Sequence, residues 1–171
     1  MPVHTHKHKG FSLIELLVVV AIILIIAAIA IPNLIRSKQA ANEASAVASL
    51  RTINTGEVTY NNSYPGTFAT LASLGPGGAT CGTPAVGAAC LIDNLLSSAS
   101  TVASAKNGYT FKVTAGAAGT GTYTTEAEPA TLGQTGTRGF CSDQNLVLFY
   151  VNPGASGPPA GTCTTASGTG L

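Results

Sequence analysis

Lys9-Gly10-Phe11-Ser12-Leu13-Ile14-Glu15 is the stretch that decides the fold of this chain, because it ends a short basic leader and opens a long apolar run. From Phe11 to Ile31 there are 21 residues, of which Ser12 and Glu15 are the polar ones. A helix of that length rises roughly 31 Å, which matches the hydrocarbon core of a bilayer. The run therefore predicts a membrane-spanning helix.

Glu15 is a carboxylate inside this apolar run. An ionised side chain in a bilayer costs about 2.5 kcal/mol or more, so a residue of this kind normally has both a partner and a function. We expect the partner of Glu15 to be a positive charge.

Two other interpretations of the apolar run are open. It could be a secretory signal peptide, because Ala28-Ile29-Ala30 fits a small-x-small cleavage site, and cleavage after Ala30 would release a soluble binding module. However, the run is longer than a typical signal core of about 7–15 residues, and it contains Glu15. It could also be a plain membrane anchor, which explains its length but neither Glu15 nor the Gly-Phe pair at its start.

The second half of the predicted helix differs from the first. Pro32 removes a backbone donor and crowds the preceding turn, so we expect the helix to kink or loosen there. Residues 33–62 contain no further proline, and their apolar residues recur at helical spacing along one face. The charged residues between them, which include Glu43 and Glu57, are expected to be solvated. The sequence predicts one long helix, apolar all round over residues 11–32 and amphipathic over residues 33–62.

Residues 63–171 have the composition of a loop-rich head with short strands, because Gly, Pro, Thr and Ser are concentrated there. Short helices are predicted near residues 67–74 and 91–105. Alternating apolar residues predict strands at 108–113, 122–127 and 144–151, joined by glycine-rich turns. These strands suggest an antiparallel meander that buries one face on the long helix. The predicted fold class is α+β, with a long helix packed against a small antiparallel sheet.

Composition limits the chemistry of the head. Only 9% of the residues are charged, and without Lys7 and Lys9 of the leader six basic and seven acidic residues remain, so no direct nucleic-acid site is evident. All three histidines lie in the leader, so the rest of the chain lacks the commonest general base and metal ligand. We expect no enzyme activity, no metal site and no cofactor.

Four cysteines lie in the head, at Cys81, Cys90, Cys141 and Cys163. An even number in an exported domain favours two disulfides over free thiols, and three pairings are possible. A zinc site is the alternative, but the spacings contain no Cys-x₂-Cys pair.

The stretch from Lys9 to Glu15 resembles the start of type IV prepilins. That family has a basic leader ending in Gly, then an N-methylated aromatic residue, then a Thr/Ser-Leu-Ile-Glu helix start, with a proline at the position of Pro32. The resemblance implies cleavage between Gly10 and Phe11 by a prepilin peptidase and methyltransferase, which leaves residues 1–10 as a removed leader. It assigns assembly roles to Phe11, Glu15 and Pro32.

The same resemblance implies a function: a structural subunit held in the inner membrane, which the pilus assembly machinery polymerises into an extracellular filament for adhesion, motility or DNA uptake. The closest alternative is a pseudopilin of a type II secretion system. Family members bound their variable region with a disulfide, so the sequence-local pairs Cys81–Cys90 and Cys141–Cys163 are expected, the second closing a C-terminal loop.

Overall fold

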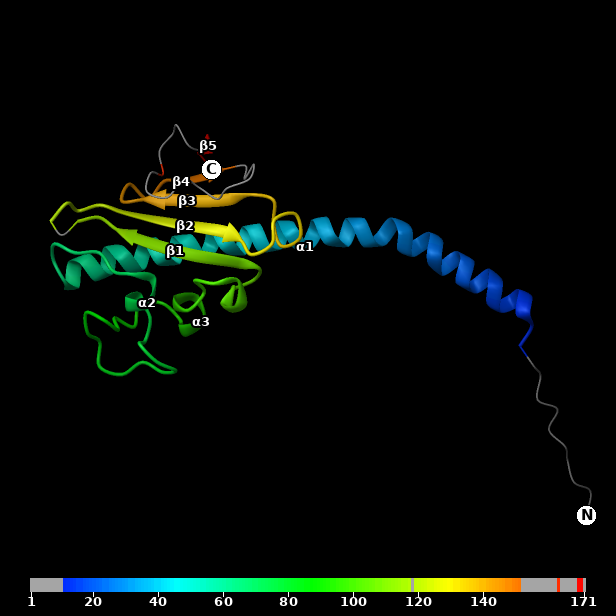
Figure 1. Ribbon diagram of the computed structural model, residues 1–171, viewed down its shortest axis with the longest axis horizontal. Helices are drawn as coiled ribbons and strands as arrows, with labels where there is room; N and C mark the ends of the chain where they lie inside the picture. Colours follow the sequence, from blue (N-terminus) through cyan, green and yellow to red (C-terminus); the bar gives the residue numbers. More distant parts are fainter. Residues whose placement is uncertain (1–10, 118, 152–162, 164–168, 171) are drawn as a thin grey trace, which may run out of the picture. The chain divides into compact units, whose positions relative to one another are not determined.

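The computed structural model describes residues 11–117, 119–151, 163 and 169–170 (Figure 1). The chain divides into two compact units, one ending at Ser37 and the other beginning at Lys38. Helix α1 (Leu13–Ser63) contributes to both. By length and composition it could cross a membrane. Its large apolar side chains between Leu13 and Ile31 are 46–77% exposed, so this surface is uncovered in the single chain.

Pro32 lies inside α1, and the helix is assigned without interruption on both sides of it. The predicted single long helix is confirmed, and the kink expected at Pro32 stays a prediction. A proline removes one donor from the ladder of backbone hydrogen bonds, and the turns on either side keep theirs.

From Lys38 onward, α1 has a buried stripe, but it differs from the expected one, because Glu43 and Glu57, which were expected to be solvated, are buried. Ala46, Leu50, Ile53 and Tyr60 are at most 2% exposed and recur at intervals of three, four and seven residues, which places them on one face. This face packs into the head core, together with Tyr109, Phe111, Ala127 and Phe140 from the sheet and with Leu74 and Leu96 from the segment before it.

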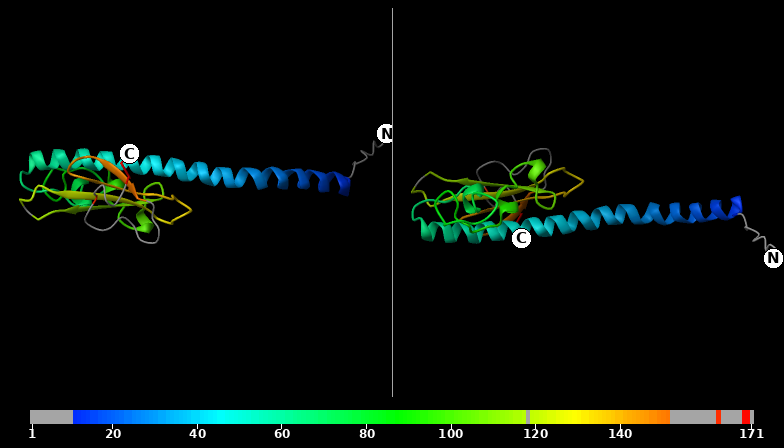
Figure 2. Two further views of the ribbon diagram at one scale, coloured as in Figure 1. Left: turned by 90° about the horizontal axis from the view of Figure 1, so that it is seen from above. Right: turned by 90° about the horizontal axis from the view of Figure 1, so that it is seen from below.

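The sheet is an antiparallel meander in the order β1-β2-β3-β4-β5 (Figures 1 and 2). Its strands are β1 (Tyr109–Ala115), β2 (Tyr123–Pro129), β3 (Gly139–Asp143), β4 (Leu148–Val151) and β5 (Thr169–Gly170). Burial alternates along the start of β1, which puts Tyr109, Phe111 and Val113 in the core. The α+β fold, with a long helix on a small antiparallel sheet, is confirmed.

The predicted strand at 144–151 is wrong in its first half, because β4 begins only at Leu148. Residues before it form a turn, in which the Asp143 carboxylate accepts a hydrogen bond from the Asn145 backbone N–H at 2.9 Å. Asp and Asn side chains compete with strand pairing by bonding to nearby backbone in this way. Strand β3 was not predicted at all, and β5 lies beyond the predicted strands.

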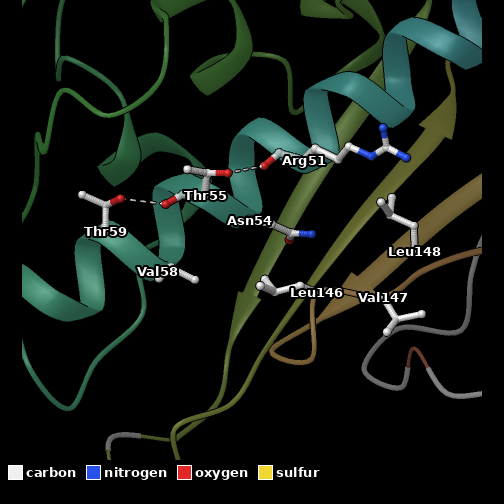
Figure 3. Close-up of a pocket in the computed structure, with 8 residues that line it drawn as sticks. All are labelled: Arg51, Asn54, Thr55, Val58, Thr59, Leu146, Val147 and Leu148. Carbon is white, nitrogen blue, oxygen red and sulfur yellow. Dashed lines mark hydrogen bonds between the residues drawn. The ribbon is translucent and has the colours of Figure 1, made fainter.

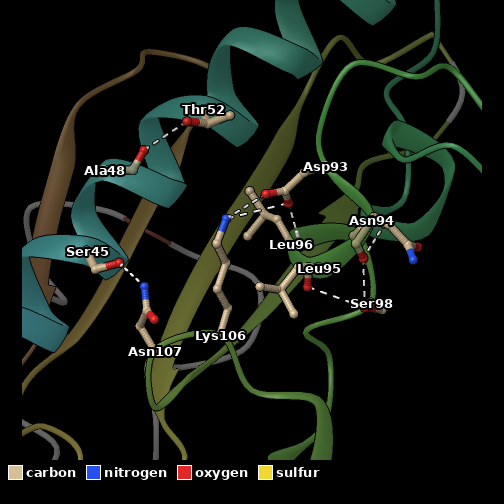
Figure 4. Close-up of polar contacts among 11 residues, drawn as sticks. Ser45, Ala48, Thr52, Asp93, Asn94, Leu95, Leu96, Ser98, Lys106 and Asn107 are labelled. Atoms are coloured by element: carbon tan, nitrogen blue, oxygen red, sulfur yellow. Dashed lines mark hydrogen bonds and ion pairs between the residues drawn. The ribbon is translucent and has the colours of Figure 1, made fainter. Parts of the chain in front are cut away.

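The helix predicted at 91–105 is also wrong in extent. The structure has α3 (Asn94–Ser97) and a 3₁₀ turn, η1 (Val102–Ser104), in its place. The Asp93 carboxylate caps α3 by accepting from the Leu96 N–H at 2.6 Å (Figure 4). Thr101 is the N-cap residue of η1. Two capping residues within eight positions divide the segment into two short helical pieces. Helix α2 (Leu71–Leu74) lies within the predicted 67–74 segment.

Candidate functional site

The first candidate site is the start of α1, where Phe11 is 78% exposed. The Glu15 carboxylate accepts a hydrogen bond from the Ser12 backbone N–H at 3.1 Å. With Ser12 before the first helical residue, Glu15 is at the third position, which is where an acidic side chain returns to cap a helix start. The negative charge also suits the positive end of the helix dipole.

This capping contact was missed by the sequence analysis, which expected a positive partner for Glu15. The spacing Ser12-x-x-Glu15 is the sequence pattern of a capping box and could have revealed it. Gly10, the other residue of the predicted cleavage junction, lies outside the described residues.

A second group of polar residues holds α1 to the sheet. The Glu43 side chain accepts hydrogen bonds from the Thr137 backbone N–H (2.9 Å) and hydroxyl (2.8 Å) and from the Arg138 backbone N–H (3.2 Å). The Arg138 guanidinium donates to its other oxygen through Nε at 2.8 Å and forms an ion pair through Nη2 at 2.6 Å. Thus, one carboxylate of α1 fixes the segment that leads into β3.

The charge of Glu43 is stabilised where it lies. Burial by itself would raise the pKa of Glu43, but the hydrogen bonds from Thr137 and Arg138 and the charge of Arg138 outweigh it and lower the pKa below its ordinary value. The carboxylate is therefore ionised at neutral pH and the contacts above are charge-assisted.

Asn54 makes a further connection between α1 and the sheet. Its amide nitrogen donates to the Ser142 hydroxyl at 2.8 Å, and its oxygen accepts from the Tyr123 and Thr125 hydroxyls at 3.3 Å each. Because all four side chains are buried, replacing Asn54 with an apolar residue would leave hydroxyls without partners.

Glu57 is fully buried on α1, and one of its oxygens accepts from the Ala69 backbone N–H at 2.9 Å. The other oxygen has no hydrogen-bond partner among the described residues. Burial raises the pKa of Glu57 to about 7, although the bond from Ala69 acts in the opposite direction. Glu57 thus connects the segment after α1 to the helix through a hydrogen bond. Its carboxyl group is so buried that the ionised form is unfavourable.

We predict that Glu57→Gln removes a dependence of stability on pH. The folded chain keeps the Glu57 proton up to about pH 7, whereas the unfolded chain releases it near 4.5. The free energy of unfolding should therefore fall as pH rises through this window, by about 3 kcal/mol in total. Glutamine stays neutral and keeps an oxygen for the Ala69 N–H.

Urea unfolding of the detergent-solubilised chain at several pH values, followed by near-ultraviolet circular dichroism, measures this slope. Glu128→Gln, which changes a partly exposed carboxyl on β2, is the control and should keep the wild-type slope. An unchanged slope in Glu57→Gln would refute the prediction.

Two disulfides close loops in the head. Cys81 is bonded to Cys90, and Cys141 of β3 to Cys163. These are the sequence-local pairs, but most of the C-terminal loop between Cys141 and Cys163 lies outside the described residues. Cys141, Cys163 and Phe149 form a small buried cluster beside the main core. Among the described residues, no group of three or more His, Cys, Asp and Glu side chains could hold a metal ion.

Comparison with known proteins places the start of the chain in a family. Residues 5–31 match the prokaryotic N-terminal methylation motif. The chain is 47% identical over 70 residues to the type IV wide pilus major component PilA4 of Thermus thermophilus, covering 39% of this chain and 53% of that protein. It is 43% identical over 54 residues to the type IV major pilin protein PilA of Myxococcus xanthus, covering 32% and 24%. The N-terminal part of the chain is that of a type IV pilin-family protein.

The relatives of this pilin-family chain also include a secretion protein. It is 36% identical over 73 residues to the type II secretion system core protein G of Escherichia coli, covering 41% of this chain and 50% of that protein. The chain spans about half of the length of most of these relatives and about a quarter of the Myxococcus protein. No solved structure is significantly similar to this pilin-family chain.

Proposed function

We propose that this chain is the structural subunit of a type IV pilus and polymerises through its N-terminal helix into an extracellular filament. The observation that carries the proposal is the apolar part of α1, which is exposed all round and has a single carboxylate, Glu15, in its first turn. An apolar surface of this size needs a bilayer or other copies of the chain to cover it. The inner membrane covers it before assembly, and neighbouring helices cover it in the filament.

In the proposed filament, Glu15 faces the N-terminal amine that cleavage creates at Phe11 of a neighbouring copy. A buried ion pair is weak evidence for stability, but it can select one register, because a misplaced subunit would leave a charge unpaired in an apolar core. The assembly residues are therefore Phe11, Glu15 and Pro32, and the filament serves adhesion, motility or DNA uptake. The role of the chain is structural rather than enzymatic.

A pseudopilin of a type II secretion system is the second candidate, supported by the similarity to core protein G. Two observations favour the pilus subunit. The identity to the two pilus proteins is higher, and the head has two disulfides, of which one closes a C-terminal loop. Deleting the gene separates the candidates. Loss of a surface filament that contains this chain, identified by mass spectrometry, supports the pilus subunit, whereas loss of protein secretion with filaments intact supports the pseudopilin.

Processing of the leader is predicted to depend on Gly10. A small residue lets the prepilin peptidase approach the backbone closely, so Gly10→Val should leave an uncut precursor in the membrane. Without the free Phe11 amine, this precursor should not enter filaments. Intact-mass measurement of membrane and filament fractions checks both points, and it also detects N-methylation of Phe11.

The matched control is Val3→Leu, which changes the leader away from the junction and should be processed normally. Wild-type filaments whose subunits still contain residues 1–10 would contradict this prediction. Cleavage after Ala30 would instead indicate a soluble binding module, the remaining alternative.

A further inference from the structure

An open groove of about 610 Å³ lies in the head, between the exposed face of α1 and the turn that joins β3 to β4 (Figure 3). Val58 of α1 lines one side, and Leu146, Val147 and Leu148 line the other. Val58, Leu146 and Val147 are 42–49% exposed, so the groove presents apolar side chains to its surroundings.

The α1 side of the groove is also less polar than its two threonines imply. The Thr55 hydroxyl donates to the Arg51 carbonyl at 3.0 Å, and the Thr59 hydroxyl donates to the Thr55 carbonyl at 2.8 Å (Figure 3). Because both hydroxyls are bonded to the helix backbone, they have less capacity to bind water or a polar ligand. Among the described lining residues, Arg51 carries the only charge.

Leu146 has a backbone conformation that is costly for its residue type. Its φ is 65°, in the left-handed region, and its N–H donates to the Asp143 carbonyl at 2.9 Å to close the turn. Glycine or asparagine is the usual residue at such a position, since a branched side chain is strained there. The turn therefore carries a strained leucine whose side chain is 49% exposed and lines the groove. Strain of this kind commonly marks a functional position.

We propose that this groove binds the apolar N-terminal helix of a second copy of the chain, an inference that rests on the proposed function. The chain itself supplies a matching ligand: the side chains of α1 between Leu13 and Ile31 are apolar apart from Glu15. The charges are opposite in sign, since Glu15 is the one ionisable side chain of that segment and Arg51 is the one charged group of the described groove lining.

The symmetry of the contact agrees with a filament. Groove and apolar helix are different surfaces of the same chain, so the contact is heterologous. Each copy can present its helix to one neighbour and its groove to another. Repeating this contact builds an open filament unless the rotation between copies closes it into a ring.

The dimensions of groove and helix also match. An α-helix with its side chains is about 10–12 Å across, and the groove lining runs along α1 from Arg51 to Thr59, roughly 12 Å of helix.

Leu146→Gly separates assembly from folding. Glycine relieves the strain of the left-handed position, so the head should be at least as resistant to heat as the wild type. Loss of the Leu146 side chain from the contact should nevertheless lower filament yield by about tenfold. Val147→Ala should lower the yield less, and Val102→Ala, which truncates a valine that is 66% exposed on η1, should leave it unchanged.

A photo-crosslinking phenylalanine analogue at position 147 of the full chain identifies the occupant. In isolated filaments, we expect it to join the head of one copy to a peptide within residues 11–31 of another. Normal filament yield from Leu146→Gly, or crosslinks only to other heads or to a different protein, would overturn the inference and leave the proposed function standing. If wild-type cells form no filament containing this chain, both fail.

Discussion

Glu15→Val is expected to reduce the number of filaments sharply while leaving the head folded. Valine removes the carboxylate that we propose faces the Phe11 amine of a neighbour, so each subunit would leave that amine unpaired in an apolar core. The variant helix is more apolar than the wild type, so insertion into the membrane should not suffer. The head should still form both disulfides and resist protease. Filaments are counted by electron microscopy in cells that have no other subunit to copolymerise.

The structure supplies a sharper control for this experiment. Glu15 also caps its own helix through the Ser12 N–H, and valine removes this contact together with the charge. Glu15→Gln retains an oxygen that can accept from Ser12 but has no charge. If the charge selects the register, Glu15→Gln should lose filaments as Glu15→Val does. Wild-type filament yield from Glu15→Gln would indicate that capping, and not charge, is the function of this residue.

Glu43→Ala is expected to destabilise the head by about 3 kcal/mol, the lower end of the range for breaking a buried ion pair. The substitution leaves the Thr137 and Arg138 backbone N–H groups without the carboxylate that accepts from them. Arg138 is 40% exposed in its side chain and can be partly hydrated, which limits the loss. Pulse proteolysis in urea, applied to the detergent-solubilised chain, measures the change.

The acid behaviour of the wild type tests the same cluster. The pKa of Glu43 is lower in the folded chain than in the unfolded chain. Its contribution to stability is therefore complete above about pH 4.5 and is lost as pH falls through the pKa of the folded chain.

Lys106→Met is the control for Glu43→Ala, because it breaks the ion pair with Asp93, whose side chain is 57% exposed, and should cost at most about 1 kcal/mol. Equal losses from the two substitutions would contradict the role given to Glu43.

The sequence predicted the elements whose structure depends on residues close together in the chain, namely the long helix and the first two strands. The apolar run ending at Ile31 and the long helix α1 follow from the sequence, and β1 and β2 follow from alternating aromatic and β-branched residues. Which residues of α1 are buried was predicted less well, since Glu43 and Glu57 lie in the interior. Strand β3 was missed because Gly139, Ser142 and Asp143 have low strand propensity, and pairing with β2 and β4 determines its conformation instead.

The polar contacts of the head could not be predicted from sequence for a related reason. Glu43 and Arg138 are 95 residues apart, and no pattern near either residue indicates the other. The same holds for Asn54, whose partners lie on β2 and β3. By contrast, the cap at Ser12 is encoded within four residues and was available from the sequence. The Ser12–Glu15 cap could be predicted and the Glu43–Arg138 contact could not, because the first partners are close in the sequence and the second are far apart. The strength of the contact plays no part in this difference.

The positions of the two disulfides have a mechanical consequence. Each bond joins residues that follow α1 in the chain, so neither one links the helix covalently to the sheet. A pulling force applied to α1 therefore reaches the sheet through the backbone beyond Ser63, through side-chain packing and through the contacts of Glu43 and Asn54. Reduction of the disulfides would weaken the head against heat, whereas its attachment to the helix under tension would depend on contacts that neither disulfide provides.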